Sequence, residues 1–154
     1  MGTDAKRPRW RFTGAYAFTP RFQAGLEFNP AAGEVGPTAN WVALTETDRW
    51  PMVTLGTSSD RIFSPPGTQS VYVTAARSVS TRAAVYGGVS YGGFEKRPVF
   101  PWGANLRLTN KLDGMVMHDG RNTHLMLTHA AGDHNVTLLW VKTRYLGVSI
   151  GRSF

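Results

Sequence analysis

Residues 10–29, with the sequence WRFTGAYAFTPRFQAGLEFN, decide the fold of this chain. Every second residue from Trp10 to Phe18 is apolar or small, and after the turn TPR the alternation continues from Phe22 to Phe28. Successive side chains of a strand point to opposite faces, so a period of two indicates a strand with one apolar face. The stretch therefore predicts an antiparallel hairpin whose second face is small or polar.

The same alternation recurs to the C-terminus and predicts an all-β protein without helices. Short turns such as TNK and AGD alternate with longer connections, which is typical of an antiparallel up-and-down meander. A closed barrel of this kind needs an even number of strands, and the pattern gives about eleven, so we expect roughly 10–12. A split strand, an unusual closure and a piece of a larger barrel are all open explanations. The predicted strands are residues 10–18, 22–28, 38–46, 51–58, 69–77, 82–92, 99–108, 112–119, 122–130, 134–142 and 145–154.

The composition limits the class of protein. The chain has 154 residues, a length that suits one domain, and 17 Lys and Arg against 10 Asp and Glu give a net charge of +7. Cysteine is absent, which excludes disulfides, thiolate zinc sites and cysteine nucleophiles. No stretch reaches the roughly 18 apolar residues of a membrane helix, but alternating membrane strands escape such a search. We expect residues 1–8 to form a flexible basic tail and residues 9–154 to form a single β-barrel domain.

The residue types on the two strand faces indicate which solvent each face meets. The non-apolar face of residues 69–76 carries Tyr72, Thr74 and Ala76, whereas a water-exposed face normally carries more charge. Aromatic side chains gather near strand ends, as in the interfacial belts of membrane proteins. We therefore expect the apolar face to meet lipid and the other face to line a lumen. The aromatic residues predicted to be lipid-facing or interfacial are Trp10, Phe12, Tyr16, Phe18, Phe22, Phe28, Phe100, Trp102 and Trp140.

The C-terminal segment YLGVSIGRSF alternates apolar residues and ends in Phe154. Together with the phrases FTPRFQAGLEFN and ANLRLTNKLDGMVMHDG, it resembles the strands and periplasmic hairpins of bacterial outer-membrane β-barrel proteins, a group that includes porins and barrels associated with exopolysaccharide export. The resemblance implies a transmembrane barrel with Leu146, Val148, Ile150 and Phe154 as the C-terminal assembly signal. Arg152 departs from the pattern, because it shares the lipid-facing parity.

The same resemblance implies a location and a set of partners. The location is the bacterial outer membrane, although the chain itself shows no signal peptide. The partners are membrane lipid, the outer-membrane assembly machinery, and other envelope proteins or further copies of the chain.

Polar side chains converge on the predicted lumen when the apolar face points outward. A ring of arginines in a wet lumen favours anions, whereas arginines paired with acids would plug the barrel, and the sequence leaves both arrangements open. The predicted function is a passive pore or a non-catalytic envelope or assembly component, with no cofactor. The residues predicted to line the lumen are Arg9, Arg11, Gln23, Glu27, Arg82, Asn105 and Arg107.

Two other classes of protein give different expectations. A lipid-modifying enzyme within the barrel would use Ser58 or Ser59, but no nucleophile-elbow motif is present and we predict no enzyme. The main alternative is a soluble antiparallel barrel that binds a small apolar ligand. Its closed interior would be lined by Phe12, Tyr16, Leu26, Phe100 and Leu106.

Metal and nucleic-acid binding are not predicted. The histidines match no metal-ligand spacing, since His124 and His129 differ in parity on one predicted strand. Basic residues interleave with an aromatic residue only in residues 6–11, at the terminus, and a nucleic-acid module usually shows a broader patch.

Overall fold

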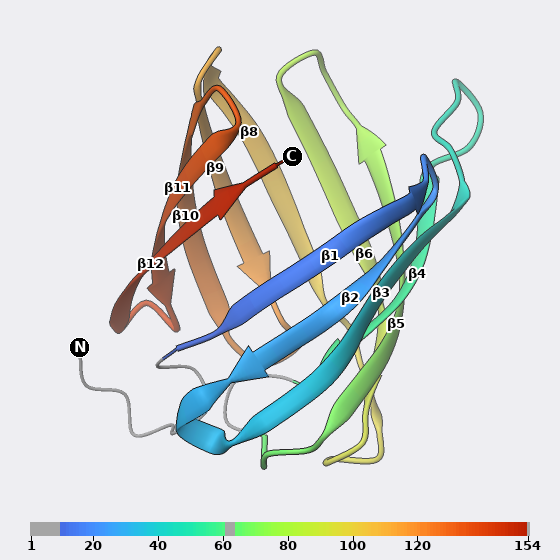
Figure 1. The fold of residues 1–154 in the computed structure, drawn as a ribbon. Coiled ribbons are helices and arrows are strands. Elements are labelled where there is room, and N and C mark those ends of the chain that lie inside the picture. The colour runs from blue at the N-terminus through green and yellow to red at the C-terminus, as the bar shows by residue number, and fades with distance from the viewer. Residues whose placement is uncertain (1–9, 61–63, 154) are drawn as a thin grey trace.

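The computed structural model describes residues 10–60 and 64–153, which form one antiparallel β-sheet. The prediction of an all-β antiparallel meander is confirmed, because strands adjacent in the chain pair with each other (Figure 1). The predicted tail, residues 1–8, lies outside the described residues, as do Arg9 and Phe154. The strands are β1 (Phe12–Thr19), β2 (Phe22–Asn29), β3 (Glu34–Leu44), β4 (Met52–Ser59), β5 (Gln69–Ser78), β6 (Ala83–Gly92), β7 (Pro98–Val99), β8 (Trp102–Thr109), β9 (Leu112–His118), β10 (Thr123–Ala131), β11 (His134–Val141) and β12 (Tyr145–Arg152), and the 3-10 helix η1 (Pro30–Ala32) follows β2.

Proline explains the two largest differences between the observed and the predicted strand boundaries; the other strands differ by one or two residues at their ends. β3 begins at Glu34 rather than residue 38, because Pro37 pairs with β2 while β4 joins β3 only from Ala39 onward. Pro37 therefore lies where β3 has no second neighbour, and its missing N–H breaks no ladder there. The predicted strand 99–108 is divided into β7 and β8, and Pro101 lies between the two pieces.

The connections define two ends of the sheet. Two-residue turns join β1 to β2, β8 to β9 and β10 to β11 at one end, which we call the short-turn end. The other end carries the connections 60–68 and 93–101, and we call it the long-loop end. A hydroxyl shapes the short turns: Thr19 and Thr109 accept hydrogen bonds from the backbone N–H two residues later, at 3.2 Å in each case. Such local bonds favour a tight turn over continued strand.

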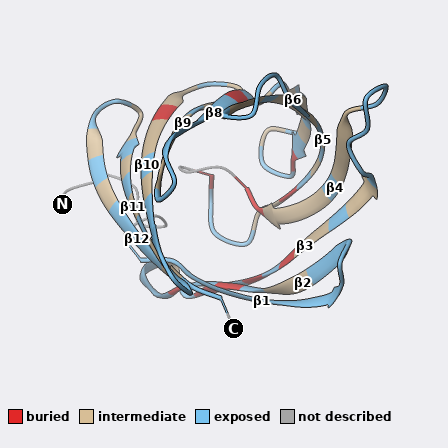
Figure 2. Ribbon diagram, turned by 90° about the horizontal axis from the view of Figure 1, so that it is seen from above, coloured by how far each residue is buried: buried red, intermediate tan, exposed pale blue. Residues whose placement is uncertain are grey.

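The sheet curls into a ring whose two ends, β1 and β12, are not paired (Figure 2). The predicted closed barrel is therefore corrected to an open, curved sheet. The path from β1 to β12 contains eleven strands, an odd number, so both edge strands run from the long-loop end to the short-turn end. Direct pairing of these two edges would be parallel, unlike every other pairing in the sheet.

Candidate functional site

The concave face of the curled sheet is identified by hydrogen bonds that join strands across an intervening one. The hydroxyl of Tyr72 on β5 donates to Asn40 on β3, and Ser59 at the end of β4 donates to Glu27 on β2. Side chains of strands two apart approach each other only on the inner side of a curved sheet. A side chain at Gly56, on the strand between, would overlap the Tyr72 ring, so glycine there makes room for the tyrosine.

The convex face carries the apolar side chains. All nine aromatic residues predicted to be lipid-facing or interfacial are exposed, and so are Leu146, Val148 and Ile150 of the predicted assembly signal. Their exposed fractions run from 38% for Phe22 to 76% for Ile150. The soluble-barrel alternative required five apolar residues to line a closed interior, and the structure leaves all of them exposed. These are Phe12, Tyr16, Leu26, Phe100 and Leu106.

Arg9 lies outside the described residues, and five of the other six residues predicted to line the lumen fall into two groups at opposite ends of the sheet. Arg11 and Glu27 form an ion pair at the long-loop end. Arg82, Asn105 and Arg107 line one pocket at the short-turn end. Gln23 is exposed on the same face as Glu27, four residues further from the long-loop end. The arginines thus form separate clusters instead of a single ring.

Glu27 anchors the long-loop end. Its side chain is only 2% exposed, and it accepts hydrogen bonds from the Ser59 hydroxyl and, at 3.0 Å, from the Ser59 backbone N–H, besides its contact with Arg11. These bonds satisfy a buried carboxylate that would otherwise be costly to remove from water. They also fix the point at which the chain leaves β4.

The β4–β5 connection then turns into the ring, where Figure 2 shows its described residues inside the outline of the strands. Two buried acidic residues, Glu34 and Asp60, accept hydrogen bonds that fix this connection. Glu34 at the start of β3 accepts from the Gly67 N–H at 2.8 Å, and Asp60 accepts from the Phe94 N–H at 3.3 Å. Ser64 within the connection is buried. The long-loop end of the ring is therefore partly filled by the chain's own backbone, an arrangement that strand periodicity does not reveal.

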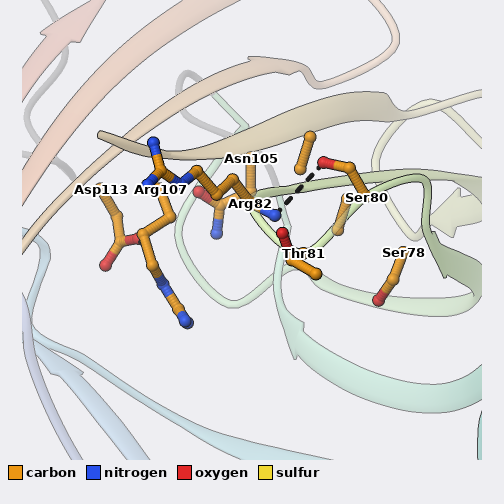
Figure 3. Close-up of a pocket in the computed structure, with 9 residues that line it drawn as sticks. Ser78, Ser80, Thr81, Arg82, Asn105, Arg107 and Asp113 are labelled. Atoms are coloured by element: carbon orange, nitrogen blue, oxygen red, sulfur yellow. Dashed lines mark hydrogen bonds and ion pairs between the residues drawn. The ribbon is translucent and has the colours of Figure 1, made fainter. Parts of the chain in front are cut away.

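The pocket at the short-turn end, which we call the arginine pocket, is a hollow of about 140 Å³ (Figure 3). Arg82 and Arg107 line it together with the amide of Asn105 and the hydroxyl groups of serine and threonine side chains. No acidic partner of Arg82 is found in residues 10–60 and 64–153. Arg107 Nε lies 3.8 Å from Asp113 Oδ1, a loose pair in which Arg107 is exposed and Asp113 is partly exposed. The pocket is lined by Ser78, Ser80, Thr81, Arg82, Ala83, Ala84, Asn105, Arg107 and Asp113.

An apolar patch continues from this pocket along the concave face. Asn105 of the pocket pairs with Met115, Met115 with Met126, and Met126 with Leu139. Paired residues share a face, so these side chains form a row, and Met117 lies two residues beyond Met115 on the same face. All four apolar side chains are partly exposed. We call Met115, Met117, Met126 and Leu139 the methionine patch. The small and polar residues of the sequence predict a polar lining for this face, and the patch was not predicted, although Met115 and Met117 alternate with Val116 in the sequence.

His124, Ser58 and Ser59 have structural partners. Asp119, in the β9–β10 turn, lies 3.1 Å from His124 Nε2 and accepts two backbone N–H bonds at 2.8 Å. Burial raises the pKa of Asp119, but the bond from His124 and the backbone bonds outweigh burial and hold the pKa below its usual range. Ser59 is bound to Glu27, and Ser58 donates to the Ser59 carbonyl at 3.2 Å. Neither serine has a hydrogen bond to a histidine in the part of the chain that the structure describes.

Comparison with protein-family models, with curated proteins and with solved structures found no match. No cluster of three or more His, Asp or Glu side chains suited to a metal ion occurs among the described residues. No helix within these residues has the length and apolar character needed to cross a membrane.

Proposed function

We propose that the chain is an outer-membrane β-barrel protein that acts as a passive pore for small solutes. The observation that carries the proposal is the order of side chains on the convex face. Exposed Phe28, Tyr91, Trp102 and Trp140 lie toward the long-loop ends of their strands, and Phe18, Phe22 and Trp41 lie toward the short-turn end. Between these two aromatic levels the exposed side chains are mainly aliphatic, for example Leu55, Val73, Val89, Leu127 and Leu138.

This order supports a membrane location for physical reasons. Aromatic rings favour the two lipid–water interfaces, and aliphatic side chains favour the hydrocarbon between them. A water-exposed convex face of this composition would be an apolar patch far larger than soluble monomers normally carry. The strands have 7–11 residues apart from β7, near the roughly 9–11 that a tilted membrane strand needs.

The two ends of the sheet support an orientation. Outer-membrane barrels have short periplasmic turns and longer extracellular loops. β12 runs toward the short-turn end, so the C-terminal residues lie at the end that the proposal assigns to the periplasm (Figure 1).

The folded-in β4–β5 connection favours a second candidate function. A barrel whose long-loop end is occupied by its own chain suits a non-catalytic envelope or assembly component as well as a narrow pore. The two candidates share the membrane location and differ only in whether solutes pass.

The free edges of β1 and β12 set a condition for either candidate. Unpaired backbone groups cost several kcal/mol each in hydrocarbon, so an open seam does not persist in a bilayer. We expect the two edges to meet in lipid as a parallel pair.

A disulfide across the seam tests this closure. Because the chain has no cysteine, the double substitution Ala15→Cys and Ser149→Cys supplies its only thiols, and both positions lie on the concave face.

Mild oxidation in vesicles should give an intramolecular disulfide, detected by mass spectrometry after proteolysis. Ala15→Cys with Ala84→Cys on β6 is the control pair, and no disulfide is expected there, since bridging requires Cα atoms within about 7 Å. A disulfide between two chains would show that a second copy occupies the seam. Absence of any disulfide would contradict direct closure.

The test of the pore is a planar-bilayer recording with the purified protein. We expect discrete current steps of small amplitude, because the β4–β5 connection narrows one end. Insertion without conductance would support the envelope-component candidate. A chain that stays folded, monomeric and soluble without detergent would refute both.

A further inference from the structure

We propose that the concave face binds an amphiphilic anion, with Arg82 and Arg107 holding its charged group and the methionine patch contacting its apolar part. The inference deepens the proposed function, because it names a ligand class for the same lumen. It rests on two features that adjoin each other, a pocket lined by two arginines, of which Arg82 forms no ion pair within residues 10–60 and 64–153, and an exposed apolar row.

The arginine pocket has the chemistry of an oxyanion site. Arg82 and Arg107 carry two positive charges, and Asp113 is the acidic residue among the lining residues; its contact with Arg107 is long at 3.8 Å. A second carboxylate, that of Glu46, lies beside the pocket and is bound to the N–H and hydroxyl of Ser78. A guanidinium offers paired N–H donors that match a carboxylate or phosphate group. Ser80 and Thr81 line the same hollow with their hydroxyl groups (Figure 3), whereas the Ser78 hydroxyl donates to Glu46 at 3.0 Å.

The methionine patch provides an apolar surface next to the arginine pocket. Met115 lies two residues from Asp113 on β9 and opposite Asn105, and both of these residues line the pocket. Two residues along a strand span roughly 7 Å, so an alkyl chain attached to a bound head group reaches Met115 and then Met126. Methionine side chains are flexible and polarizable and suit variable apolar ligands. A small inorganic ion would use only the arginines.

Binding measurements on the protein in a nonionic detergent separate the two contributions. The probes are octanoate, acetate and octylammonium, titrated calorimetrically against protein and against detergent alone. We expect octanoate to bind more than about tenfold more tightly than acetate, because the patch removes its chain from water. Octylammonium should not bind above the detergent baseline, because the pocket is positive.

Matched variants locate the site. Arg82→Gln should weaken octanoate binding about fivefold or more, and Asp113→Asn should strengthen it, since removal of the competing carboxylate leaves both arginines free. Met126→Gln should weaken octanoate and leave acetate unchanged. Arg144→Gln is the control: it removes the same charge beside Tyr145 in the β11–β12 turn and should leave binding unchanged. Circular dichroism checks that each variant is folded.

The outcomes distinguish this inference from the proposed function. Octanoate binding no stronger than to detergent alone, or equal losses in Arg82→Gln and Arg144→Gln, would overturn the inference even if the protein inserts and conducts. Equal binding of acetate and octanoate would show a simple anion site and remove the role of the methionine patch. A chain that fails to enter vesicles but binds octanoate with this pattern would retain the inference and lose the pore.

Discussion

Val73→Arg should abolish or strongly reduce insertion into lipid vesicles. Val73 lies midway along β5 on the convex face, between Leu55 and Val89 of the neighbouring strands, and it is exposed. A guanidinium at the bilayer midplane costs about 2–4 kcal/mol on a lipid-facing barrel position, and no acidic residue pairs beside it to offset the cost. Reversible folding into vesicles, followed by urea titration, measures the loss.

Two control variants separate the effect of the added charge from the loss of packing and from its position on the sheet. Val73→Ala removes the same packing without adding charge and should retain most of the insertion. Ser149→Arg places the same charge on the exposed concave face of β12 and should be tolerated, because water reaches it there. Normal insertion of Val73→Arg would show that the convex face does not meet hydrocarbon, since exposed substitutions in water usually change stability by only about 0.5 kcal/mol.

Strand periodicity was enough to predict the sheet, because an apolar residue at every second position of a strand places all apolar side chains on one face and gives a visible repeat of two. The hairpin of residues 10–29 shows this, since its alternation gives both the pairing and the side on which Glu27 lies. Boundaries failed at Pro37 and Pro101, where the effect of proline depends on whether a neighbouring strand needs its N–H. That requirement is a property of the assembled sheet and is not encoded locally.

The arrangement of the candidate site was less predictable. Parity placed Arg82, Asn105 and Arg107 on one face, but their convergence in a pocket depends on which strands are neighbours. The inward fold of the β4–β5 connection depends on contacts of Glu27 and Glu34 with residues more than thirty positions away. The sequence pattern indicated an odd number of strands and left an unusual closure among its explanations, and the structure shows an unpaired seam between β1 and β12.

Glu27→Ala should be the most destabilising substitution on the concave face. The carboxylate is buried and joins three parts of the chain: Arg11 before β1, β2 itself, and Ser59 at the start of the β4–β5 connection. Hydrogen bonds to a charged group contribute about 1.5–3 kcal/mol each, and their removal leaves the buried Ser59 N–H without its acceptor. Because Arg11 is half-exposed and water can solvate it, we expect a net loss of about 2–4 kcal/mol in the free energy of unfolding.

Glu46→Ala provides a closely matched control. Glu46 also accepts hydrogen bonds from the backbone N–H and hydroxyl of one serine, Ser78, at 2.8 and 3.0 Å, but the group is exposed. Water replaces these bonds, so the loss should be at most about 1 kcal/mol. Urea titration of both variants in detergent measures the difference, and equal losses would contradict the role assigned to burial.

Glu27→Ala should also change the conductance of the pore. Without Glu27 the β4–β5 connection loses its fixed starting point at Ser59, while the Glu34–Gly67 bond remains at its far side. The connection then samples positions away from the ring interior, so single-channel current should rise and fluctuate more than in the wild type. Glu46→Ala, at the opposite end of the sheet, should leave the current unchanged. Unaltered conductance in a folded Glu27→Ala protein would show that this connection does not limit passage through the barrel.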